Sequence, residues 1–222
     1  MAVALIVAAG RGERLGSGRP KALLTLAGRP MLEWSVDALR AVPGVERIVV
    51  ALPADELACA PAGTVAVAGG EVRSLSVREA LAASGEGDPV IVHDAARPLA
   101  STALFERALR ELASSGAAAV IAAAPVADTI KEAAADGRTV ARTVDRARLW
   151  AVQTPQVFTL AALTRALSGA SAEDLAAATD DAWLVERSGG TVRLLPSEEL
   201  NLKVTTPEDL RIAELMIGGR PV

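Results

Sequence analysis

Short apolar segments alternate with longer amphipathic segments along most of the chain. The apolar segments predict strands at Val3–Ala8, Arg47–Ala51, Thr64–Ala68, Pro89–His93, Ala117–Ala122 and Thr191–Leu194. The amphipathic segments predict helices at Pro30–Leu39, Glu71–Ala83, Thr102–Ser114, Leu160–Leu167 and Asp180–Arg187. A last helix is expected after Thr206, a typical N-cap that is followed by proline. The alternation indicates βαβ units, and therefore an α/β fold with a mainly parallel sheet flanked by helices.

The region 126–146 does not follow this alternation. Two strands are expected there, Val126–Glu132 and Thr139–Val144, and Asp136-Gly137 between them is typical of a hairpin turn. Such a two-stranded β-arm is only marginally stable in water by itself. We therefore expect the arm to pack against a second copy of the chain, which predicts a homodimer.

Length and composition narrow the class of protein. The 222 residues fit a single domain, 1–222, with the arm as an extension. A net charge of −4 disfavours nucleic acid or an anionic membrane as a partner. The apolar run before Arg11 is too short to span a bilayer and reads poorly as a signal peptide. A single cysteine, Cys59, excludes internal disulfides and fits a cytoplasmic protein.

A glycine-rich loop follows the first expected strand. Small residues let backbone N–H groups approach an anion, and open α/β sheets bind ligands at the carboxyl ends of their strands. A dinucleotide site is disfavoured, because Gly16 comes one position too late and the second expected strand does not end in an acid. A Walker loop is disfavoured because Lys21 follows a proline. Arg14 and Lys21 are then expected to hold a polyphosphate, the alternative being a flexible turn with solvated arginines.

Two further charged residues stand beside expected strand and helix ends. Asp94 follows an apolar strand and is expected to hold Mg²⁺ by one oxygen, together with substrate phosphates. The alternative is a helix-capping aspartate paired with Arg97. His93 is the only histidine, and we expect it to pack at the strand end rather than to transfer protons. Lysine occurs only three times, so Lys203 before the last helix suggests a compact charge for a phosphate; an exposed surface lysine is the alternative.

Several short motifs occur in a fixed order. They are Ala8-Ala9-Gly10-x-Gly12-x-Arg14, Pro20-Lys21, Gly69-Gly70-Glu71-x-Arg73-x-x-Ser76-Val77, His93-Asp94-Ala95-Ala96-Arg97-Pro98, Asp128-Thr129, Thr143-Val144-Asp145-Arg146, Thr154-Pro155-Gln156, Thr179-Asp180-Asp181 and Lys203-Val204-Thr205. Each motif is weak alone, but the ordered set, which covers nearly the whole chain, resembles the 2-C-methyl-D-erythritol 4-phosphate cytidylyltransferases of the non-mevalonate isoprenoid pathway. Glu71 departs from the family, in which many members carry aspartate, and Trp183 stands where members usually have a small residue.

The resemblance implies a Rossmann-like nucleotidyltransferase fold, with CTP and a phosphorylated sugar alcohol as substrates and Mg²⁺ as cofactor, held at Asp94. The implied nucleotide contacts are Ala8, Ala9, Gly10, Gly12, Gly70, Glu71, Ser76, Asp94 and Ala95. The implied catalytic residues are Arg14, Lys21, Arg146 and Lys203, the first two at the α-phosphate. The implied contacts of the phosphorylated alcohol as a whole are Arg97, Asp128, Thr129, Arg146 and Lys203. Arg146 and Lys203 are implied to position its phosphate, with Arg146 reaching across the dimer.

The residue types suit this chemistry. A phosphate monoester loses its second proton near pH ~6, so the attacking group is already an anion and needs no general base. Cations must instead hold two anions together. The nearest alternative is a cytidylyltransferase for ribitol 5-phosphate. More distant ones are an enzyme that makes nucleotide sugars, a nicotinamide-dependent oxidoreductase and a noncatalytic nucleotide-binding module.

Overall fold

A seven-stranded sheet forms the centre of the molecule, with the strand order β11-β7-β10-β6-β1-β4-β5. The computed structural model describes residues 1–10, 12, 18–197 and 200–219. The strands of this sheet are β1 (Ala2–Val7), β4 (Val45–Leu52), β5 (Val65–Ala68), β6 (Val90–Asp94), β7 (Ala119–Pro125), β10 (Trp150–Phe158) and β11 (Val192–Pro196). All neighbours pair in parallel except β10, which is antiparallel to both β6 and β7. The expected mainly parallel sheet is confirmed.

Strand β10 was not among the expected strands. Its sequence includes Gln153-Thr154-Pro155-Gln156, and proline is unusual inside a sheet because it cannot donate a backbone hydrogen bond. The pairing of β10 with β7 is irregular between Val152 and Gln156. Pro155 therefore lies where the ladder is interrupted, and the two halves of the strand pair on either side of it.

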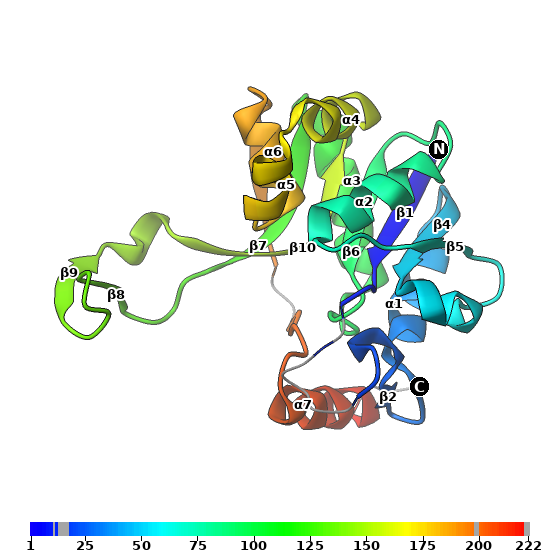
Figure 1. Ribbon diagram of the computed structural model, residues 1–222, viewed down its shortest axis with the longest axis horizontal. Helices are drawn as coiled ribbons and strands as arrows, with labels where there is room; N and C mark the ends of the chain where they lie inside the picture. The colour runs from blue at the N-terminus through cyan, green and yellow to red at the C-terminus, as the bar shows by residue number, and fades with distance from the viewer. Residues whose placement is uncertain (11, 13–17, 198–199, 220–222) are drawn as a thin grey trace.

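Helices cover both faces of the sheet (Figure 1). One face packs against α1 (Met31–Arg40) and α3 (Thr102–Ser115). The other packs against α2 (Arg73–Ala82), α4 (Leu160–Gly169), α5 (Ala172–Ala177) and α6 (Asp181–Arg187). Side chains of β1 alternate between them, since Ala4 and Ile6 join the first core and Val3 and Leu5 the second. The expected helices are present with their ends shifted by at most two residues, while α5 was not expected.

A smaller core lies beyond the carboxyl ends of β1 and β6. Here α7 (Pro207–Gly218) packs with the hairpin of β2 (Thr25–Leu26) and β3 (Arg29–Pro30). The Thr206 side chain accepts a hydrogen bond from Asp209 N, which confirms the expected N-cap. Short 3₁₀ turns occur at η2 (Lys21–Leu23), η3 (Ala54–Cys59) and η4 (Arg146–Arg148). Buried Val204 joins this core, so the loop before α7 is held against the body.

The expected arm projects from one side of the body as a separate antiparallel pair (Figure 1). Its strands are β8 (Ile130–Ala133) and β9 (Val140–Val144), so the first strand starts four residues later than Val126. Gly137 has a φ of 66°, which fits the expected hairpin turn. Most arm residues are exposed, among them Val140 at 56 %.

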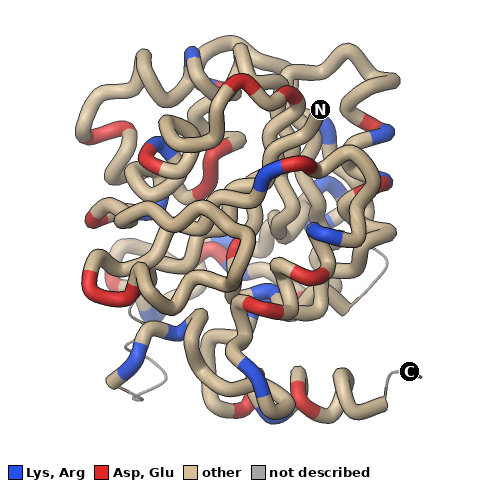
Figure 2. The backbone as a smooth tube through the Cα atoms, turned by 90° about the vertical axis from the view of Figure 1, so that its right-hand side faces the viewer, with Lys and Arg blue, Asp and Glu red and all other residues tan. Residues whose placement is uncertain are grey.

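Two properties concern the molecule as a whole. Acidic and basic positions are interspersed over the side that Figure 2 presents, in keeping with the small net charge. No helix in the described part of the chain is both long and apolar enough to cross a lipid bilayer.

Candidate active site

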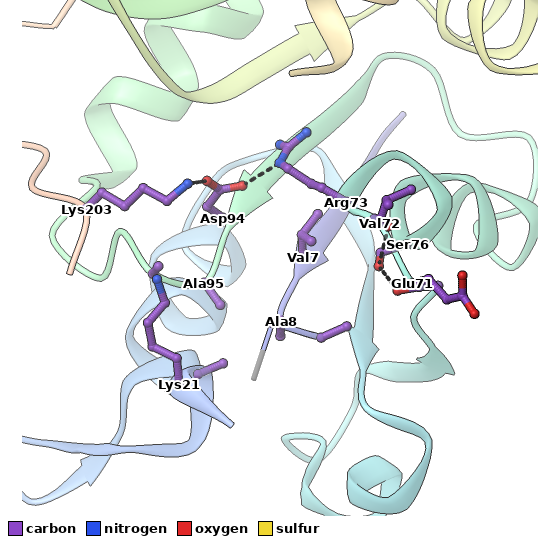
Figure 3. A pocket seen from close by; sticks show the side chains of 15 residues that line it. Val7, Ala8, Lys21, Glu71, Val72, Arg73, Ser76, Asp94, Ala95 and Lys203 are labelled. Carbon is purple, nitrogen blue, oxygen red and sulfur yellow. Dashed lines mark hydrogen bonds and ion pairs between the residues drawn. The ribbon is translucent and has the colours of Figure 1, made fainter. Parts of the chain in front are cut away.

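A pocket of about 230 Å³ lies at the carboxyl ends of β1 and β6, where open α/β sheets bind their ligands. It brings together most residues that the sequence assigns to the nucleotide and to catalysis. These are Ala8, Ala9, Gly10, Lys21, Gly70, Glu71, Ser76, Asp94, Ala95 and Lys203. Residues from the two ends of the chain therefore meet in one place, as Figure 3 shows for Lys21 and Lys203.

The glycine-rich loop and Lys21 are packed directly against each other. Lys21 N donates a hydrogen bond to Gly10 O over 3.4 Å. Gly12 has a φ of +67°, and a Cβ there would lie only 2.7 Å from Lys21 Cβ. Glycine is thus required at position 12 both for its backbone conformation and for this close approach. Arg14, the other cation assigned to this loop, lies outside the described residues.

Two adjacent glycines, Gly69 and Gly70, lie at the opposite wall of the pocket. A Cβ on Gly69 would collide with Ala9 Cβ, and a Cβ on Gly70 with Leu75 Cβ. This close packing draws the start of α2 towards the loop after β1. Ser76, which is 2 % exposed, donates to carbonyl oxygens at the same turn, including Gly70 O at 3.4 Å. The Glu71 carboxylate points away from Asp94 and Lys21 (Figure 3).

Asp94 connects two cations at the centre of the site. Its Oδ1 accepts from Arg73 Nε at 3.0 Å and its Oδ2 from Lys203 Nζ at 2.7 Å. Burial opposes ionisation, but Arg73 and Lys203 hold the pKa of Asp94 well below its usual range. The alternative of a capping aspartate paired with Arg97 is wrong, because the Arg97 guanidinium instead donates to Asn201 O at 2.6 Å.

Arg73 has a second carboxylate partner, Asp181, which is fully buried at the start of α6. Burial alone would lower the pKa of Arg73, but Asp181 and Asp94 raise it, so the guanidinium stays charged. Neither residue had a role assigned from the sequence. Both residues belong to the ordered motifs, and a charged residue at the start of a helix was the feature that could have indicated a role. For Arg73 this feature was missed, because the helix was expected to begin at Glu71 and α2 begins at Arg73 itself.

His93 is buried and held by hydrogen bonds on both ring nitrogens. Nδ1 lies 3.1 Å from Thr154 Oγ1, and Nε2 lies 3.3 Å from Arg97 O. Burial lowers the pKa of His93 to about 4, so the ring is neutral near pH 7. The expected packing of His93 at the strand end is confirmed.

An adjoining pocket of about 240 Å³ shares three residues with the first, namely Arg73, Asp94 and Lys203. Arg97, assigned to the acceptor substrate, lines this second pocket. The loop that carries Lys203 is anchored on both sides of it. Asn201 Nδ2 donates to Thr154 O at 2.7 Å, and Val204 N donates to Ala96 O at 2.8 Å. Lys203 is therefore placed on the wall between two cavities.

Three assigned acceptor residues lie on the arm and line neither pocket of the single chain. Asp128 and Thr129 are exposed just before β8, and Arg146 begins η4. The Arg146 guanidinium donates to Ala127 O within the arm itself. One copy of the chain therefore does not bring these three residues to the site.

The doubly wound sheet, the glycine-lined pocket and the cations shared with a second pocket define the class: an α/β nucleotidyltransferase. The chain belongs to the family of 2-C-methyl-D-erythritol 4-phosphate cytidylyltransferases, whose family model matches residues 2–219. It is 47 % identical to the protein of that name from Nocardia farcinica, over 98 % of this chain and 94 % of that one. It is also 47 % identical to the one from Deinococcus radiodurans, over 97 % and 89 %.

Solved structures agree with this assignment. The crystal structure of 2-C-methyl-D-erythritol 4-phosphate cytidylyltransferase from Thermus thermophilus superposes with a TM-score of 0.81 at 36 % identity, covering 97 % of this chain and 98 % of that one. The enzyme of the same name from Francisella tularensis gives a TM-score of 0.82 at 30 % identity, covering 96 % and 98 %. The resemblance inferred from the motifs is thus confirmed over nearly the whole chain.

Proposed function

We propose that this chain transfers the cytidylyl group of CTP to 2-C-methyl-D-erythritol 4-phosphate, forming 4-diphosphocytidyl-2-C-methyl-D-erythritol and pyrophosphate. Its family supports this reaction, which is a step of non-mevalonate isoprenoid precursor synthesis. The observation that carries the proposal is the shared wall: Lys21 and Lys203 line one pocket, and Lys203 also lines the next. Two anionic substrates can thus be held by one group of cations.

CTP occupies the first pocket in this proposal. The turn Ala8–Gly10 and the Gly70 turn are lined by small residues, so backbone groups can approach the nucleotide closely. Lys21, together with Arg14, stabilises the negative charge that grows at the α-phosphate during attack. Base contacts come from the Gly70–Ser76 wall. The Glu71 carboxylate would have to turn inwards to contribute one, since it points out of the pocket.

The acceptor phosphate lies in the second pocket, between Arg97 and Lys203. One of its oxygens forms a bond to the α-phosphorus of CTP while the bond from that phosphorus to the bridging oxygen breaks, and pyrophosphate leaves. The nucleophile is already ionised, so the proposal needs no general base, in accord with a neutral, buried His93. The protein supplies position and compensating charge, as in other phosphoryl transfers.

The pocket suits a magnesium ion that is held largely by substrate. Asp94 is ionised, and each of its oxygens accepts one hydrogen bond, which leaves further lone pairs. Among the described residues there is no cluster of three His, Cys, Asp or Glu side chains that could form a protein cage. Mg²⁺ commonly takes one or two carboxylates plus phosphates. Bound beside Asp94, it would neutralise triphosphate charge.

The arm supports a homodimer as part of the same proposal. A two-stranded sheet with exposed apolar residues such as Val140 gains stability by packing on another surface. Arg146, Asp128 and Thr129 sit on this arm, so a partner's arm would deliver them to the acceptor pocket. We also place the enzyme in the cytoplasm, where its free and exposed Cys59 would remain reduced.

Pyrophosphate release tests the proposed reaction directly. We expect release from CTP with 2-C-methyl-D-erythritol 4-phosphate, weaker release with UTP, and none when magnesium is removed with a chelator. Ribitol 5-phosphate, the acceptor of the nearest alternative enzyme, should give little product at equal concentration. Faster release with ribitol 5-phosphate would overturn the acceptor assignment, and undiminished release in chelator would overturn the magnesium assignment.

A further inference from the structure

Four charged side chains form a chain of ion pairs from the protein interior to the pocket. Asp181 contacts Arg73, Arg73 contacts Asp94, and Asp94 contacts Lys203. Asp181 at one end is completely buried, with a side chain that is 0 % exposed, and Lys203 at the other end is 41 % exposed. Arg73 and Asp94 between them are 22 % and 10 % exposed. The four residues come from α6, α2, β6 and the loop before α7 (Figure 3 shows the last three).

We infer that Asp181 and Arg73 are positioning residues for the reaction, which set the place of Lys203 through Asp94. This inference rests on the proposed function, because it gives Lys203 a fixed position at the acceptor phosphate. Neither residue has to touch substrate for this role. Lys203 carries the effect into the pocket, and the other three residues determine where its ammonium group lies.

The geometry of the Arg73 guanidinium explains how the anchor acts. A free guanidinium binds a carboxylate best with two parallel hydrogen bonds, one to each oxygen. Here Nη1 is held by Asp181, and only Nε reaches Asp94, at Oδ1. The contact with Asp181 fixes the orientation of the guanidinium, and Asp94 Oδ2 accepts instead from Lys203 Nζ, at 2.7 Å. Without Asp181, the guanidinium can turn so that Nε and Nη2, which has no partner among the described residues, take both oxygens and displace the lysine.

Folding stability does not explain this arrangement. Two atoms of the network, Arg73 Nη2 and Asp181 Oδ1, are buried and have no hydrogen-bond partner among the described residues. Leaving a buried polar group unsatisfied costs folding free energy, and buried ion pairs often contribute little net stability. Such a network is costly as a stabilising device, whereas a fixed ammonium group at the pocket has a direct use.

Kinetics of the Asp181→Asn variant test the inference. We expect its KM for 2-C-methyl-D-erythritol 4-phosphate to rise about tenfold, while the KM for CTP stays within about twofold. Arg73→Lys should do the same, because lysine has one nitrogen in place of the separate Nε and Nη1 that contact the two carboxylates. Arg73→Lys is also the test variant to use if circular dichroism shows that Asp181→Asn does not fold. Asp174→Asn is the matched control, since Asp174 caps α5 and pairs with Arg187 away from both pockets.

A double-mutant comparison separates positioning from general damage. If Asp181 acts through Lys203, Asp181→Asn should change kcat/KM by less than about twofold in a Lys203→Ala background. An equal loss in both backgrounds, or a loss no larger than that of Asp174→Asn, would overturn the inference.

Chemical labelling gives a readout that does not depend on turnover. Acylation of Lys203, followed by mass spectrometry, should become severalfold faster in Asp181→Asn as Asp94 releases the ammonium, while Lys131 on the arm is unchanged. Unchanged labelling of Lys203 would contradict the inference even in an active enzyme. A wild-type protein that releases no pyrophosphate, yet shows faster labelling in the variant, would instead contradict the proposed function alone.

Discussion

At the scale of single residues, Asp94 determines the charge balance of the site. One carboxylate sits between Arg73 and Lys203, and Asp181 offsets Arg73 on its other side. These four charges sum to zero before substrate arrives. Lys21 lines the same pocket from the opposite side and adds positive charge there (Figure 3). We propose different tasks for the two lysines: Lys203, held by Asp94, acts on the acceptor phosphate, and Lys21 acts on the triphosphate.

Replacement of Lys21 should accordingly reduce turnover rather than binding of the acceptor. We expect Lys21→Ala to lose at least roughly 100-fold in kcat, the range found when a single transition-state donor is removed. Steady-state pyrophosphate release measures this, with thermal unfolding to check the fold. Arg78→Ala is a control with the same change of charge, because Arg78 is exposed on α2 and lines neither pocket. Near-normal turnover of Lys21→Ala would remove the residue from the catalytic role.

At the scale of elements, the strands and helices that follow a regular pattern of apolar residues could be predicted from the sequence. The strands that end at Val7 and Asp94 are regular apolar segments, so their carboxyl ends and the crevice there could be predicted. Strand β10 could not be predicted in this way, because proline and polar residues are unusual in a central strand. It forms a strand because it pairs with β6 on one side and β7 on the other.

The contact of Asp94 with Lys203 was equally out of reach of local pattern. The two residues are 109 positions apart and meet only because the loop of Lys203 is fixed by hydrogen bonds to residues of other elements. Motif order could suggest that both serve one site, but spacing along the chain carries no information on which oxygen meets which cation.

The N-cap of α7 gives a prediction at this scale. Thr206 and Asp209 form a capping box immediately after the loop of Lys203. Thr206→Ala should lower the free energy of unfolding by about 1 kcal/mol, the usual cost of losing an N-cap. Denaturant unfolding measures this, and Thr206→Ser should retain most of the stability because serine caps equally well. A loss of stability as large in Thr206→Ser would show that the methyl group, not the cap, matters.

At the scale of the whole molecule, the body and the arm divide the assigned residues between them. The body holds Lys21, Arg97 and Lys203 around two pockets, while the arm carries Thr129 and Arg146 on exposed surface away from both. In a single copy, the second pocket, which we propose for the acceptor, thus lacks some of its assigned contacts. A symmetric pair of chains that exchange arms would complete both sites at once.

Mixing two inactive variants tests this division. If Arg146 acts in the partner's site, a Lys21→Ala chain still donates a normal Arg146, and an Arg146→Ala chain still offers a normal pocket. Random pairing makes half of the dimers mixed, each with one complete site, so about a quarter of wild-type activity should return for a two-fold symmetric dimer. The measurement is pyrophosphate release after the two variants are unfolded and refolded together, beside each refolded alone. If Arg146 served its own chain's pocket, no dimer would contain a complete site, and the mixture would stay as inactive as its components.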